Sequence, residues 1–123
     1  MQHTLLHSFP MLRRDYLLRM IEEMGRIVAR IRELLVSGDI DRVETELQSA
    51  ARLASLDLQT IRALTADSLL LLLLPAPTAD AGRLKIVIQV LALDAERAVA
   101  AGDEEGAERL LQKAERLQQA ATK

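Results

Sequence analysis

The sequence contains no cysteine, tryptophan or asparagine, and Phe9 and Tyr16 are its only aromatic residues. Without cysteine there can be no disulfide, no thiol nucleophile and no thiolate metal site. Few aromatic residues argue against a single-strand nucleic-acid binder, which stacks bases on aromatic side chains. The five glycines form neither a GxGxxG nor a Walker-type phosphate loop. Several classes of enzyme and binding protein are thereby excluded.

Long apolar segments are also missing. The longest apolar run, Leu69–Leu74, has six residues, far fewer than the roughly 20 that a membrane span needs. Residues 1–9 lack the basic segment and long apolar core of a targeting signal. We therefore expect a cytoplasmic protein that does not use the membrane. The excess of arginine over lysine is typical of a GC-rich or heat-tolerant bacterial source.

What remains is the composition of one globular domain. The chain has 123 residues, of which half are apolar and 28% are charged, with a net charge of −2. That length suits one domain with a real core, and that charge does not attract nucleic acid or anionic lipid. Sustained period-2 alternation is absent, whereas apolar residues recur at spacings of three and four, so we predict an all-α fold.

The helical pattern divides the chain into a helical bundle of five or six helices. We expect a flexible N-terminus over residues 1–10 and a single all-α domain over residues 11–123. Within it we predict a first hairpin over 11–55, a leucine-rich helical insert over 56–77 and a second hairpin over 78–121. Thr65 is a predicted N-cap for the leucine helix, which Pro75 and Pro77 should end, and Thr78 should cap the next helix.

Two glycine–aspartate pairs mark the corners of the hairpins. Gly38 and Gly102 can adopt the left-handed conformation that ends a helix, and Asp39 and Asp103 can cap the helix that follows. Aligning residues 37–53 with 101–117 gives eight identities in seventeen positions, with the corners in register. We therefore predict a structural repeat of two helical hairpins.

The second copy of this repeat resembles the latter half of a tetratricopeptide repeat. The Gly102-Asp103 turn is followed by small residues at Ala107 and Ala114, where that family lets paired helices approach closely. Leu110 and Leu111 stand where its bulky residues usually are. The first helices lack the family's aromatic pattern, and the units lie 64 residues apart rather than 34. The resemblance implies tetratricopeptide-like hairpins but not a regular solenoid.

The start of the first helix carries a second resemblance. Phe9 followed by the segment DYLLRMIEEM at residues 15–24 is similar to the opening of a family of small bacterial proteins of unknown function. That resemblance implies a similar fold, ending in a tetratricopeptide-like hairpin, and no activity.

Apolar residues are more numerous than one small bundle obviously needs. A helix that is apolar on all sides must be covered on all sides. A compact monomer, a homodimer or a different protein partner could each provide that cover. We favour a homodimer, with a possible interface at Leu69, Leu70, Leu72, Leu73, Ile86, Val90 and Leu93.

No constellation of residues indicates catalysis. His3 and His7 have the i, i+4 spacing of metal ligands, but no acidic residue precedes Asp15, so we predict neither a metal nor a cofactor. We expect a non-enzymatic interaction or scaffold module. One alternative is a nucleic-acid-binding or regulatory module that uses an arginine face, although the chain's charge does not favour nucleic acid. Another is an enzyme with a small-molecule site among Met20, Met24 and the leucines. The arginine face comprises Arg13, Arg14, Arg19, Arg26, Arg30 and Arg32.

Overall fold

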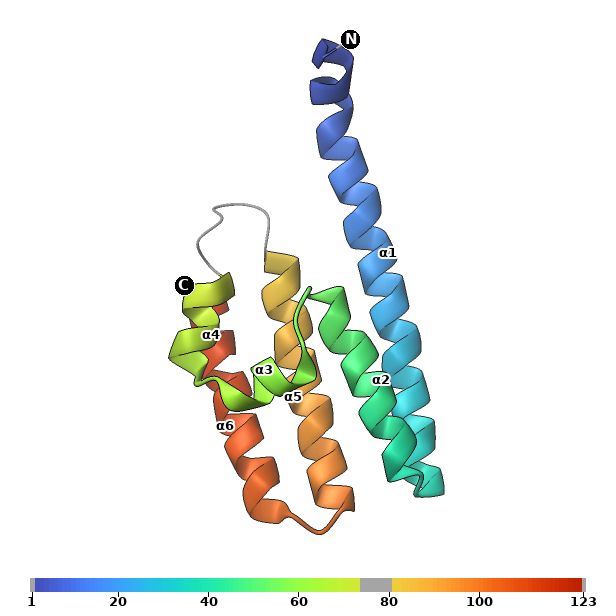
Figure 1. Cartoon of the computed structure of the whole chain (residues 1–123), viewed down its shortest axis with the longest axis vertical. Helices are drawn as coiled ribbons and strands as arrows, with labels where there is room; N and C mark the ends of the chain where they lie inside the picture. Colours follow the sequence, from blue (N-terminus) through green and yellow to red (C-terminus); the bar gives the residue numbers. More distant parts are fainter. Residues whose placement is uncertain (1, 74–80, 123) are drawn as a thin grey trace.

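The computed structural model describes residues 2–73 and 81–122, and within them the side chains of residues 14–73 and 82–122. This part of the chain forms six α-helices and no strand, which confirms the all-α prediction. Figure 1 shows the helices gathered into a bundle, with the N-terminal half of the longest helix extending past the others. The helices are α1 (Gln2–Ser37), α2 (Ile40–Leu53), α3 (Leu58–Ala63), α4 (Ala66–Leu73), α5 (Ala81–Ala100) and α6 (Glu104–Ala121).

The helix α1 begins earlier than the sequence suggested. We expected a flexible segment over residues 1–10, but the helix starts at Gln2 and continues through Pro10. Residues 2–9 contain no glycine, and a proline inside a helix removes one backbone donor without necessarily ending it. With 36 residues at 1.5 Å each, α1 is about 54 Å long, whereas the 20-residue α5 is about 30 Å long.

The two predicted corners are present and share the same backbone geometry. Gly38 and Gly102 have φ values of 80° and 81°. The Asp39 amide donates to the Leu34 carbonyl at 2.9 Å, and the Asp103 amide donates to the Ala98 carbonyl at 2.8 Å. Each of these hydrogen bonds joins an amide to the carbonyl five residues earlier, and so provides a partner for a carbonyl that a helix end would otherwise leave without one. Both aspartates then cap the following helix, as predicted.

A third corner of the same kind was not predicted, because it contains no glycine. At the end of α2, the Leu56 amide donates to the Ala51 carbonyl at 3.1 Å, while Ser55 takes a φ of 60°. The amide of Leu58, at the start of α3, is bonded by the side chain of Gln48 at 3.0 Å, and Asp57 makes no side-chain cap. Thr65 does cap α4 as predicted, because its hydroxyl accepts from the Ser68 amide.

The leucine run of α4 is buried on one side only. Leu69 and Leu73 are fully buried, but Leu71 is 79% exposed and Leu72 is 44% exposed. The chain itself therefore leaves part of this helix uncovered, and cover by a second copy stays a prediction. A run of identical residues has no periodicity, so the sequence could not tell which side faced the core. The predicted stop at Pro75 and Pro77 and the cap at Thr78 lie outside the described residues.

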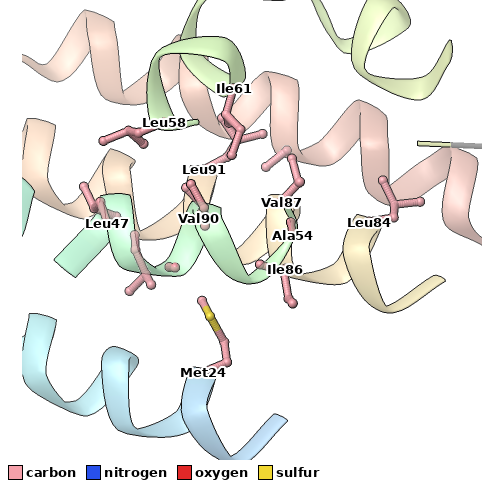
Figure 2. Close-up of a cluster of buried hydrophobic side chains, with 14 of the residues drawn as sticks. Met24, Leu47, Ala54, Leu58, Ile61, Leu84, Ile86, Val87, Val90 and Leu91 are labelled. Carbon is pink, nitrogen blue, oxygen red and sulfur yellow. The ribbon is translucent and has the colours of Figure 1, made fainter. Parts of the chain in front are cut away.

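The helix α5 is the centre of the bundle. It packs against α6 most extensively and also against α2, α1 and α3. Figure 2 shows Met24 of α1 directed toward the layer formed by α2 and α5, where Val90, Ile86 and Leu47 gather. Both faces of α5 therefore contribute to the core of a single chain.

Most of the residues predicted to form a dimer interface instead lie in the core of a single chain. Five of the seven are buried inside one chain: Leu69, Leu73, Ile86, Val90 and Leu93. Of these five, Ile86 is 6% exposed and lines a groove at the surface. Leu70 is half-buried against the core, and Leu72 alone of the seven is exposed. Leu111, which stands at one of the bulky positions of the tetratricopeptide-like pattern, is 51% exposed. None of the described helices has the length and apolar character to cross a membrane.

Candidate functional site

A cluster of charged side chains joins α2, α3 and α5. Asp94, in α5, is only 1% exposed and is the one buried charged residue among the described side chains. Its carboxylate accepts two hydrogen bonds from Arg62 of α3, both 2.9 Å long, and a third from Arg97 at 2.6 Å. Glu44 of α2 completes the cluster by accepting two further hydrogen bonds from Arg62. Three helices are thereby fixed to one another by charge-assisted bonds.

Burial and pairing act on Asp94 in opposite directions. Burial alone would raise the pKa of its carboxyl, but the hydrogen bonds from Arg62 and Arg97 outweigh that effect and lower the pKa below its ordinary value of 3.8. The same contacts raise the pKa of Arg62. Asp94 is consequently an ionised, fully paired group, which suits a structural tie between helices better than proton transfer.

Lysine 113 extends this tie to α6. The ammonium of Lys113 donates to the carbonyl oxygens of Arg62 and Leu64, at 3.1 and 2.6 Å. These carbonyls lie at the C-terminal end of α3, where a positive charge is favourable. Burial lowers the pKa of Lys113. A polar hollow of about 420 Å³ lies beside the cluster, but Glu44 and Arg62, which line it, are bonded to each other.

The larger of these two cavities is an apolar groove. It lies between α1, the first half of α5 and the end of α6, and has a volume of about 850 Å³. Its lining residues are Leu17, Met20, Ile21, Met24, Gly25, Gly82, Lys85, Ile86, Ile88, Gln89, Gln118, Ala121 and Thr122. Hydrophobic side chains with a few polar groups at the edges are typical of surfaces that bind another molecule.

The groove continues onto an exposed apolar strip of α1. Met20 and Met24 point inward and are almost fully buried, whereas Ile21 is 67% exposed and Leu18 is 51% exposed. Gly25 lies one turn beyond Ile21, and a Cβ placed there would meet no atom within 4 Å. We call Leu18, Ile21 and Gly25 the α1 strip. Large apolar side chains exposed beside a groove mark a candidate binding surface.

The arginine face of α1 is partly neutralised. Arg26 bonds Glu23, Arg30 bonds Glu46 of α2 and Arg32 pairs with Glu96 of α5. Hydrogen bonding and charge from Arg26 lower the pKa of the exposed Glu23. The side chain of Arg13 lies outside the described residues.

Some of the predicted site residues lie where the sequence placed them, and the structure also contains two candidate sites that were not predicted. The four corner residues Gly38, Asp39, Gly102 and Asp103 occupy the positions that the sequence assigned to them. The charged cluster and the α1 strip were both missed as sites. A carboxylate within the apolar run of α5 was the only local signal for the cluster. The side chains of His3 and His7 lie outside the described part, within which no three acidic or histidine residues gather as metal ligands.

Comparison with known proteins adds no relative: no family model, no curated protein and no solved structure matches this sequence.

Proposed function

We propose that this chain is a non-enzymatic protein–protein interaction module that self-associates through the α1 strip and the adjoining groove. The observation that carries the proposal is the contrast within two turns of α1. Met20 and Met24 are buried by the chain itself, while Leu18 and Ile21 are left more than half exposed. Covering an isoleucine side chain is worth about 1.5–3 kcal/mol, so such a strip favours association.

The groove supports the same proposal because the strip and the groove are continuous. Ile21 and Gly25 belong to both, so a helix laid along the strip also covers part of the groove. Leu71 and Leu72 of α4 are exposed as well, but they lie on a different helix, which packs against α6. They provide a natural control surface, because α4 contributes none of the residues that line the groove.

We keep the tetratricopeptide-like interpretation of the hairpin formed by α5 and α6 as part of this proposal. The Gly102-Asp103 corner and the burial of Ala107 and Ala114 support it. We also propose that the protein acts in the cytoplasm, which fractionation of native cells would test. A nucleic-acid function is less favoured, because Arg26, Arg30 and Arg32 are each paired with a carboxylate.

Light scattering on the full-length chain at micromolar concentration tests the proposal. We expect twice the 13.7 kDa mass of one chain. Ile21→Asp should give the single-chain mass without loss of helical signal, because Ile21 is largely exposed in the isolated chain. Leu71→Asp, at the exposed position of α4, should stay dimeric. A single-chain mass for the unmodified protein would refute self-association, and a dimeric Ile21→Asp would refute the α1 strip as its surface.

A further inference from the structure

We draw no further inference here: the strongest candidate, the apolar groove between α1, α5 and α6 with the exposed α1 strip beside it, belongs to the surface already described, and nothing in the structure shows what covers it.

Discussion

Arg62 and Asp94 form a bidentate pair in which the guanidinium donates two hydrogen bonds of 2.9 Å to the carboxylate. The two residues are 32 positions apart and belong to α3 and α5. α3 is only six residues long and cannot be stable on its own, so this pair and the Lys113 contacts hold it against the bundle. The charged cluster therefore stabilises the bundle against which α1 packs.

Removing the carboxylate should therefore destabilise the whole chain. Asp94→Ala leaves two arginines without their buried partner, and we expect a loss of about 2–4 kcal/mol in the free energy of unfolding. Arg62 keeps Glu44, which moderates the loss. Urea denaturation followed by circular dichroism measures the change. As a control, Glu44→Gln should cost less than about 1 kcal/mol, because the Glu44 side chain is 45% exposed and that of Asp94 only 1%. Equal losses in the two variants would contradict the structure.

Asp94 should also give the protein a specific sensitivity to acid. Its pKa is lower in the folded chain than its ordinary value of 3.8, so its stabilising effect is complete above that value. As pH falls below it toward the folded-state pKa, the unfolded chain binds the proton more readily and this stability is lost. The free energy of unfolding of the unmodified protein should fall more steeply below about pH 4 than that of Asp94→Asn. If the free energy of unfolding falls equally steeply with decreasing pH in both proteins, Asp94 is not paired in solution.

The serine at the third corner predicts a stabilising change. Ser55 has a φ of 60°, a conformation that is strained for residues with a Cβ and free of that strain for glycine. Ser55→Gly should raise the free energy of unfolding by about 0.5–1 kcal/mol. Gly38→Ala, at the first corner with a φ of 80°, should lower it by about 1 kcal/mol. Thermal denaturation of both variants checks the two signs, and a destabilised Ser55→Gly would contradict the corner geometry.

The two aspartate caps should respond differently when the residue whose amide bonds the cap is changed to alanine. Asp103 accepts from the Gly106 amide at 2.9 Å, whereas Asp39 accepts from the Arg42 amide at 3.4 Å. A Cβ on Gly106 would overlap the Asp103 carboxylate, so Gly106→Ala should break the cap and cost about 1 kcal/mol. Arg42→Ala leaves the first cap intact and should change stability by less than about 0.5 kcal/mol. Hydrogen exchange of the first turn of α6 would locate the loss.

The parts of the fold that the sequence predicted are those whose causes are local. A glycine followed by an aspartate fixes a corner within a few residues, which is why both hairpins could be predicted. The side on which α4 is buried could not be, because a run of leucines looks the same from every side. Arg62, which pairs with Asp94, comes from α3, and Glu44, which shares that arginine, comes from α2, so only the folded chain brings the three together. The exposure of Ile21 likewise depends on how far α5 and α6 reach along α1.

Concentration-dependent hydrogen exchange on the full-length, unmodified chain tests most directly whether the α1 strip is where two copies meet. On raising the concentration from the monomeric to the dimeric range, amides of residues 11–25 should exchange more slowly, because the paired helices no longer open separately. Amides of α4, residues 66–73, should exchange at an unchanged rate. Slower exchange in α4 with no change over residues 11–25 would contradict the account.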